Sequence, residues 1–519
     1  MNFIDIEIPF DEAENYFMPT NKEKLNKLFY QDRNFKKLQL DTTYYLIGEK
    51  GSGKTTYCAY FCNNMINNIK SKRYPITVDD YNKIIQMKKE EKLNYTHYLT
   101  LWKAILLTKL LASIENSEIS FFNGRAINNI RLLLQEYNFS QITMDTFSPV
   151  TFMDNEKFSA GIGSELSAEE SKLKGTLAQE NTTQLTKEKY IYEDNWIKFI
   201  NAIAAELSKL RLRNHHYLFI DGIDIRPRDI PYLEYSNCIF PLVRAVYELN
   251  SDILCKIKDR KKGRLQIVLL TRLDIFLKSG LSNAGSKIAD NSAFLNWSMS
   301  NEKSYRTSEL FGLVNNILEP NVQPEDEKPW DKYFNFKIAR GRDSFNSFNY
   351  FLRLTTSRPR DFVKLLKISK ELCEKDELKN PTHTIVESDL FQRAYSAYYV
   401  DSLRTGLGFY YNEAEIRVLI DFIRSIRKCR ITYGEFKEAW NRFSDRTKLE
   451  TAYGSCFNAI SLLFDNNIIA LYEDDAYYRW KFREVSIANY DYGLEENSLT
   501  DTSKFRFHWA VEKEFGLYL

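Results

Sequence analysis

The sequence predicts an α/β fold in which a parallel sheet carries helices on both of its faces. Three apolar runs typical of buried strands cover residues 42–47, 217–221 and 265–270. Each run stops at a glycine, an acid or a hydroxyl residue, and stretches with helical periodicity lie between them. Strands that alternate with helices favour a parallel sheet, whose strands are apolar throughout because both faces are covered.

Composition and charge narrow the class of protein. The chain has 519 residues, enough for about three domains of ordinary size. Its 72 basic residues nearly balance 70 acidic ones, which argues against a protein dedicated to coating nucleic acid. The seven cysteines form no CxxC pair and the five histidines form no HExxH motif. A disulfide framework, a zinc ribbon and a metalloprotease are therefore excluded.

Nothing in the sequence indicates export or a membrane anchor. The N-terminus lacks the basic and apolar regions of a secretory signal. The longest apolar helical stretch, 104–114, is too short to span a bilayer. We therefore expect a cytoplasmic protein that makes no membrane contact.

A glycine-rich loop follows the first predicted strand. It fits the pattern G-x-x-x-x-G-K-[ST], in which backbone N–H groups surround phosphate oxygens. Apolar residues recur at helical spacing after it, from Cys58 to Ile69, so we expect a helix over that range with Cys58 and Cys62 as core residues. The predicted phosphate-binding residues are Gly48, Glu49, Lys50, Gly51, Ser52, Gly53, Lys54, Thr55 and Thr56.

Each position of this loop suits one task in binding a nucleotide. Its glycines allow the backbone to approach phosphate closely, and the helix N-terminus adds its dipole. Lys54 is expected to reach the β- and γ-phosphates, Thr55 to ligate Mg²⁺ and Thr56 to donate near the α-phosphate. A plain glycine-rich turn is the alternative interpretation.

The second strand supplies the acid that such a loop requires. A predicted helix over 196–210 precedes it, and the strand ends at Asp221, which we expect to bind Mg²⁺ through a water molecule. Asp224 is the nearest carboxylate that could orient an attacking water, and a helix-capping or loop acid is the alternative for it.

The third strand ends in Thr271 and Arg272, which are candidate sensors of the γ-phosphate. A structural ion pair is the alternative for Arg272. The charged run 256–264 before this strand is interpreted as a solvated connector, with nucleic-acid contact as the alternative.

Residue spacing divides the chain into four parts. Residues 1–35 form a lead segment and 36–289 the sheet core, which carries a helical insertion at about 75–150. Within that insertion, 94–114 is predicted to be helical. A polar stretch at 158–189 is poor in bulky apolar residues and is predicted to be an exposed insertion that could order on a partner or nucleotide.

Residues 290–400 are expected to form a helical segment, with helices over 290–318 and 345–372. Pro359 suits the first position of a helix, which sets Arg358 and Arg360 at the helix N-terminus. There they could lie over the phosphates as part of a lid. The alternative is that they pair with acids such as Asp361.

The remaining residues, 401–519, show the order of a winged helix. Helices are predicted over 413–426, 433–443 and 450–464, followed by a ribbon of 468–472 and 477–482. The third helix contains no Lys or Arg, so we favour a protein-binding role over DNA reading. The basic residues that could still touch a DNA backbone are Arg479, Lys481 and Arg483 on the second ribbon strand, with Arg424, Arg427, Lys428 and Arg430.

Taken together, these motifs resemble the STAND-type P-loop ATPases, close to the origin-recognition branch of AAA+ proteins, and especially a bacterial subgroup often found in phage-defence loci. The resemblance implies a P-loop NTPase fold with an ASCE-type sheet, a helical lid with a sensor arginine at Arg358 or Arg360, and a nucleotide-controlled role in assembly. Two positions depart from the pattern: Gly222 stands where typical AAA+ proteins have Glu, and Ile225 where many STAND members have an acid. Slow hydrolysis that suits a switch is therefore expected.

The leading hypothesis is an Mg²⁺-dependent ATPase that gates assembly with a protein partner or effector, or with further copies of itself, for example in antiviral defence. ATP is favoured over GTP because no NKxD or TKxD motif follows the sheet. One alternative is an origin-recognition-like protein that binds DNA in an ATP-dependent way. Another is a scaffold that holds ATP without hydrolysing it.

Overall fold

The computed structural model describes residues 2–89, 97–114, 124–136, 196–298, 302–320, 328–340, 343–444, 447–474 and 477–518. The predicted insertion at 158–189 lies outside them. The chain divides into two units. The first, here called the sheet unit, comprises Lys36–Ile47 and Tyr57–Ala293, and the second, the helical unit, comprises Met1–Phe35, Gly48–Thr56 and Phe294–Leu519.

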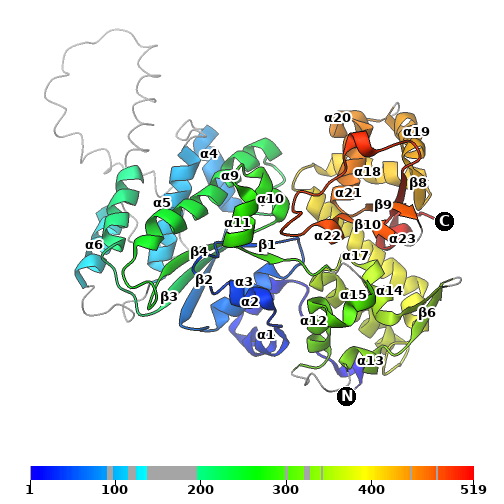
Figure 1. The fold of residues 1–519 in the computed structure, drawn as a ribbon, viewed down its shortest axis with the longest axis horizontal. Helices are drawn as coiled ribbons and strands as arrows, with labels where there is room; N and C mark the ends of the chain where they lie inside the picture. The colour runs from blue at the N-terminus through cyan, green and yellow to red at the C-terminus, as the bar shows by residue number, and fades with distance from the viewer. Residues whose placement is uncertain are drawn as a thin grey trace, which may run out of the picture. The chain divides into compact units, whose positions relative to one another are not determined.

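The predicted apolar runs form the centre of a five-stranded sheet (Figure 1). Its strands are ordered β2-β3-β4-β1-β5. The pairings of β2 with β3, β3 with β4 and β4 with β1 are all parallel, which confirms the prediction for the three apolar runs. The strands are β1 (Tyr45–Gly48), β2 (Ile69–Pro75), β3 (His215–Asp221), β4 (Leu265–Thr271) and β5 (Ser292–Leu295).

Several helices surround the sheet. Residues 196–207 are helical, as predicted, and lead toward β3. The predicted helix over 94–114 is found from Tyr98 onward, and almost all of it is buried. The named helices are α3 (Lys54–Asn63), α4 (Val78–Lys89), α5 (Tyr98–Ala112), α6 (Gly124–Glu136), α9 (Tyr232–Glu248), α10 (Leu273–Lys278) and α11 (Ala284–Asn291).

Helices cover both faces of the sheet, as predicted. The Tyr45 hydroxyl donates to a backbone carbonyl of α9 at 2.8 Å, whereas the Phe219 ring lies 5.6 Å from that of Phe61 on α3. Tyr45 on β1 pairs with Leu269 on β4, and Leu269 pairs with Ile220 on β3, so these three side chains point to the same face. Because side chains alternate along a strand, Tyr45 and Phe219 point to opposite faces. Helices α9 and α3 therefore lie on opposite faces.

The helix predicted from Cys58 to Ile69 is too long. α3 ends at Asn63, and Asn67 and Asn68 both adopt positive φ, at 46° and 65°. This turn reverses the chain, and Ile69 begins β2, a strand that the sequence did not predict. The isoleucines keep the helical spacing of α3, but the helix has already ended at Asn63, and Asn67 and Asn68, which tolerate the left-handed conformation, turn the chain into β2.

The helical unit contains two groups of elements (Figure 1). A short N-terminal helix, α1 (Lys22–Leu28), precedes α2 (Arg33–Lys37), which continues into the sheet unit. The first group after β5 is mainly helical. It comprises α12 (Glu309–Leu318), α13 (Pro329–Tyr333), the hairpin β6 (Lys337–Arg340) and β7 (Asp343–Asn346), α14 (Ser347–Leu354), α15 (Pro359–Lys375), α16 (His383–Glu387) and α17 (Asp389–Leu407).

The second group contains a four-stranded sheet of order β10-β9-β11-β8, of which only the β9–β10 ribbon was predicted. Helices α18 and α19 confirm two predicted helices, and no helix in the described residues could cross a membrane. The elements are α18 (Glu413–Ile426), β8 (Arg430–Thr432), α19 (Tyr433–Ser444), α20 (Leu449–Tyr453), α21 (Cys456–Asp465), β9 (Ile469–Asp474), β10 (Tyr477–Arg479), α22 (Lys481–Glu484), β11 (Lys504–Phe507) and α23 (Glu512–Phe515).

Four further predicted elements differ from the structure. The helix expected over 290–318 is interrupted, because β5 runs from Ser292 to Leu295 and α12 begins only at Glu309. The helix expected over 450–464 is split at Gly454, which has φ +73°. The helix expected over 345–372 is likewise two helices, α14 and α15. Lys481 and Arg483 lie in α22 and not on the second ribbon strand, which ends at Arg479.

Candidate functional site

The glycine-rich loop connects β1 to α3 as predicted. Gly51 has φ +86° and Gly53 φ +102°, conformations that side chains with a Cβ rarely adopt. A Cβ at Gly48 would lie 2.5 Å from Ser52 Oγ and 3.0 Å from Leu295 Cβ. All three glycines of the loop are therefore required by its conformation.

Donors from outside the loop hold three successive carbonyl groups. The bonds are from Arg358 Nη1 to Lys50 O at 3.3 Å, from the Arg360 N–H to Gly51 O at 3.2 Å and from Trp297 Nε1 to Ser52 O at 2.9 Å. Because a trans peptide points its C=O and the next N–H in opposite directions, these bonds turn the Gly51 and Gly53 N–H groups away from the three donors, whereas the Ser52 N–H donates to Glu49 O at 3.1 Å. Backbone N–H groups turned toward one side of such a loop can bind anions.

Two side chains of the loop fit a missing anionic ligand. Ser52 is only 2% exposed, and its Oγ has no hydrogen-bond partner among the described residues. Lys54 folds back over the loop, and its Nζ donates to Gly48 O at 2.8 Å and to Glu49 O at 3.2 Å. A phosphate would give Ser52 an acceptor and Lys54 a stronger, charged partner. The loop residues thus fit a nucleotide phosphate group.

Asp221 ends β3 as predicted and is 6% exposed. Its Oδ1 accepts the Gly222 N–H at 2.9 Å, and its Oδ2 lies 2.8 Å from Arg73 Nη2. Arg73 comes from β2 and was not a candidate in the sequence analysis. A buried carboxylate at the end of a parallel strand suits a hydrated Mg²⁺, which proteins hold with one or two carboxylates and substrate phosphates.

Gly222 cannot be replaced by the Glu that the family pattern carries. Its φ is +97°, and a Cβ would lie 2.7 Å from Ile76 O. The Ile76 N–H in turn donates to Asp221 O at 2.8 Å, which fixes this close approach of the two strands. The departure from the pattern therefore has a structural cause.

Asp224 lies in the turn that follows β3. Tyr235 of α9 fixes this turn, since its hydroxyl is 2.9 Å from Ile223 O and 3.2 Å from Ile225 O. Asp224 is half-buried and its charge contributes to the raised pKa of Tyr235, after the larger effect of burial. The aspartate is therefore held close to the end of β3.

The two candidate sensors at the end of β4 are already engaged. Thr271 is fully buried, and its Oγ1 donates to Arg272 O at 3.2 Å. Arg272 Nε donates to Asp274 Oδ1 at 3.0 Å, and Nη2 bonds the second oxygen of the same carboxylate. A bidentate pair of this kind is the structural ion pair that the sequence left open as an alternative.

Arg358 lies at the N-terminus of α15, where Pro359 is the first helical residue as predicted. Its guanidinium forms a bidentate pair with the fully buried carboxylate of Asp361, at 3.0 Å from Nε and 3.1 Å from Nη2. Burial lowers the pKa of Arg358, but the charge and hydrogen bonds of Asp361 together with the nearby Tyr398 and Tyr399 outweigh it, and the net pKa is raised. Arg358 therefore remains charged while it holds Lys50 O.

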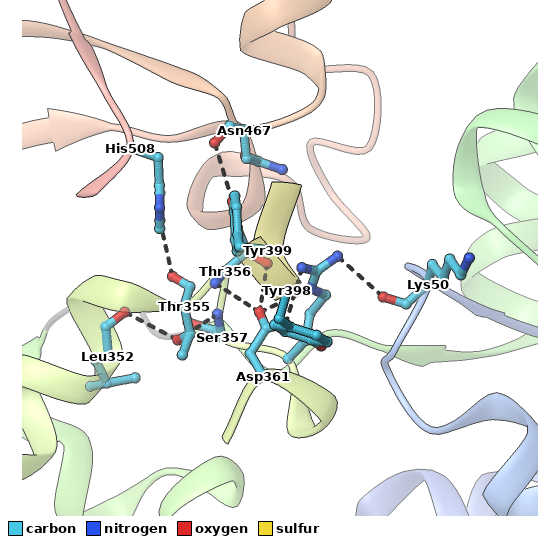
Figure 2. Close-up of polar contacts among 11 residues, drawn as sticks. Lys50, Leu352, Thr355, Thr356, Ser357, Asp361, Tyr398, Tyr399, Asn467 and His508 are labelled. Carbon is cyan, nitrogen blue, oxygen red and sulfur yellow. Dashed lines mark hydrogen bonds and ion pairs between the residues drawn. The ribbon is translucent and has the colours of Figure 1, made fainter. Parts of the chain in front are cut away.

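Asp361 also accepts hydrogen bonds from other residues (Figure 2). Its Oδ2 accepts the Thr356 N–H and hydroxyl, both at 3.2 Å, and its Oδ1 accepts the Tyr398 hydroxyl at 3.3 Å. The alternative that these arginines pair with acids such as Asp361 is thus correct for Arg358. Arg360, whose side chain packs beside Gly51, lies 3.9 Å from a different acid, Glu12.

His508 joins the C-terminal strands to the same segment (Figure 2). Its ring stacks on Tyr399, with centroids 4.9 Å apart and planes inclined by 4°, and its Nε2 lies 3.3 Å from Thr355 O. The Tyr399 hydroxyl lies 3.5 Å from Asn467 O, beyond the end of α21. A chain of buried contacts therefore runs from the glycine-rich loop through the N-terminus of α15 to the four-stranded sheet.

Three of the seven basic residues considered for DNA are paired with acids. Lys481 Nζ lies 2.6 Å from Asp465, Lys428 Nζ 2.8 Å from Glu435, and Arg424 Nη2 3.2 Å from Glu514. In the charged run 256–264, which was interpreted as a solvated connector, Lys261 and Lys262 are exposed, but Arg264 is buried and donates to Gln39 O at 2.6 Å. These pairs reduce the charge available for phosphate contacts.

Sequence reasoning missed three residues of these sites. Arg73 lies in β2, a strand that was not predicted, and no motif marks Trp297 or His508 in the sequence. The described residues contain no cluster of three or more His, Cys, Asp or Glu side chains that could hold a metal ion by themselves. Comparisons with protein-family models, curated proteins and solved structures found no match for this chain.

Proposed function

We propose that this chain is an Mg²⁺-dependent ATP-binding protein of the P-loop class. The observation that carries the proposal is the glycine-rich loop, whose carbonyls are held by outside donors and whose Ser52 hydroxyl is buried without a partner. Lys54 would bind the terminal phosphates, and Thr55 and Asp221 would hold Mg²⁺. A bound magnesium ion supplies charge neutralisation of the phosphates.

The strand order supports the ASCE type of P-loop sheet. In that type, a further strand lies between the strand before the loop and the strand that carries the metal-binding aspartate. Strand β4 takes this place between β1 and β3. The register Ile47 to Thr271 and Ile220 to Leu269 sets the carboxyl ends of these strands along one edge, where α/β proteins bind ligands.

The contacts of α15 support a lid that responds to nucleotide. Arg358 and the backbone of Arg360 bond two loop carbonyls, so a change in the loop is transmitted directly to the N-terminus of α15. Arg360 is the better candidate for contacting phosphate, because Arg358 is committed to Asp361. The order α18, α19 and then α20 with α21, which together take the place of a third helix, followed by the β9–β10 ribbon, supports a winged helix as the receiving domain.

Hydrolysis is expected to be slow, which suits a switch. Gly222 leaves no side chain directly after the metal aspartate, and Asp224 is the remaining candidate to orient water. We propose that the nucleotide state gates assembly with a protein partner or with further copies. The acid-paired basic residues favour a protein partner over DNA.

The test is ATP turnover with Mg²⁺, with and without DNA, while light scattering follows the mass. Lys54→Ala is compared with Lys50→Ala, which removes a lysine of the same loop but keeps the carbonyl that Arg358 bonds. Turnover that Lys54→Ala abolishes and Lys50→Ala retains, together with ATP-dependent growth in mass, is expected. DNA-stimulated turnover with steep salt dependence would instead support the origin-recognition-like alternative. ATP binding with no turnover and no change in mass would support the scaffold.

A further inference from the structure

The carboxylate proposed to hold magnesium already has a cationic partner. Arg73 Nη2 lies 2.8 Å from Asp221 Oδ2, and the two side chains are only 16% and 8% exposed. Most surface ion pairs contribute little to stability. A buried pair such as this one strongly affects whether a further charge can bind beside it.

The sheet register fixes this pairing. Pro75 lies opposite Asp221 and Arg73 opposite Phe219, so Arg73 and Asp221 point to the same face of adjacent parallel strands. That face is the one covered by α3, since Phe219 packs on Phe61. The charges of both groups reach the buried Cys58 thiol on α3, whose pKa is raised mainly by burial. The pair therefore faces the first turns of the helix that follows the glycine-rich loop.

The two oxygens of Asp221 have limited capacity left. An ionised carboxylate offers about four acceptor sites. The Gly222 N–H takes one on Oδ1 and Arg73 takes one on Oδ2. A water molecule bound to Mg²⁺ must therefore share these oxygens with their present donors, beside a guanidinium whose positive charge repels the ion.

We infer that Arg73 competes with hydrated magnesium for Asp221 and so sets the Mg²⁺ concentration at which the site fills. This inference rests on the proposed function, because it requires a nucleotide that brings the metal to the loop. Arg73 is a positioning residue in this scheme: it keeps the buried carboxylate ionised and oriented without metal, and it shares or releases Oδ2 when the metal binds. Nucleotide binding with and without metal then differs less than it would beside an unpaired aspartate.

The experiment measures ADP affinity by isothermal titration calorimetry, in EDTA and in saturating Mg²⁺. The dissociation constant in EDTA divided by that in Mg²⁺ measures how strongly the metal promotes nucleotide binding, and the measurement requires no turnover. In Arg73→Gln, loss of the positive charge is expected to raise this ratio by about tenfold or more. The matched control is Lys72→Gln, which removes the same charge from the neighbouring, exposed position on β2 and should leave the ratio unchanged.

An unchanged ratio in a folded Arg73→Gln variant that still binds ADP overturns the inference, as does an equal rise in Lys72→Gln. If Arg73→Gln does not fold, Arg73→Lys is measured in its place. That variant keeps the charge but loses the planar guanidinium group, so a smaller rise of about threefold is expected. An unchanged ratio again overturns the inference. Wild-type protein that binds no ADP at any Mg²⁺ concentration would instead refute the proposed function, and this inference with it.

Discussion

His508 makes the stability of the helical unit sensitive to acid. The residue is 1% exposed, and its two ring nitrogens have opposite roles. Nδ1 accepts the Ala510 N–H at 3.2 Å, so the hydrogen of the neutral ring lies on Nε2, which faces Thr355 O at 3.3 Å. A second proton at Nδ1 would point at the Ala510 N–H. Burial, with the charges of nearby arginines acting in the same direction, lowers the pKa of His508 to about 3.

The lowered pKa of His508 determines how the free energy of unfolding changes with pH. The unfolded chain takes up the proton near the ordinary histidine pKa of about 6.5, whereas the folded chain resists it down to about 3. The stabilising contribution is therefore complete above pH 6.5 and is lost as the pH falls toward 3. Between pH 7.5 and 5.0, protonation of the unfolded chain lowers the free energy of unfolding by about 2 kcal/mol through this single residue.

The assay is urea unfolding at pH 7.5 and 5.0 for the wild type, His508→Asn and His383→Asn. Asparagine keeps an oxygen that can accept the Ala510 N–H, and His383 is an exposed histidine at the start of α16. The wild type and the His383 variant should lose about 2 kcal/mol more than His508→Asn over this interval. Equal pH dependence in all three proteins would refute the reasoning, whatever their absolute stabilities.

Three further substitutions test the loop and its supports. Gly222→Glu should destabilise the protein by at least about 2 kcal/mol in thermal unfolding and should not increase ATP turnover, because the new Cβ would meet Ile76 O. A variant that is as stable as the wild type and more active would contradict this. Asp361→Asn should cost about 3–5 kcal/mol in denaturant unfolding, because it leaves a buried guanidinium uncompensated, and a loss below about 1 kcal/mol would show that the carboxylate is unimportant. Trp297→Phe should cost about 1 kcal/mol and weaken ADP binding in calorimetry, since Ser52 O loses its donor; unchanged affinity would remove Trp297 from the support of the loop.

The central strands and the loop could be predicted because local signals suffice for them. Strands β3 and β4 are buried along their length and read as unbroken apolar runs. The glycines of the loop are demanded by backbone conformations that the motif itself encodes. Pro359 marked the start of α15 for the same reason, since its fixed φ suits the first helical position.

The features that were missed depend on contacts distant in sequence. Strand β2 has basic and polar residues on an edge, so Ile69 alone looked like a helical position, and the ion pair of Arg73 with Asp221 stayed hidden. Arg358 posed a different problem, because both of its proposed partners were chemically reasonable. The structure shows the ion pair with Asp361 and, in addition, a bond to Lys50 O that neither interpretation included. Only the fold brings these groups together.

The central claim is that the glycine-rich loop binds nucleotide phosphates through its backbone and Lys54. Its most direct test is calorimetric binding of ATP with Mg²⁺ to the wild type, Lys54→Ala and Lys50→Ala. We predict that the wild type and Lys50→Ala bind with similar affinity and that Lys54→Ala loses at least about 2 kcal/mol of binding free energy, a factor of roughly thirty. Absence of binding to the wild type, or equal binding by Lys54→Ala, would contradict the claim.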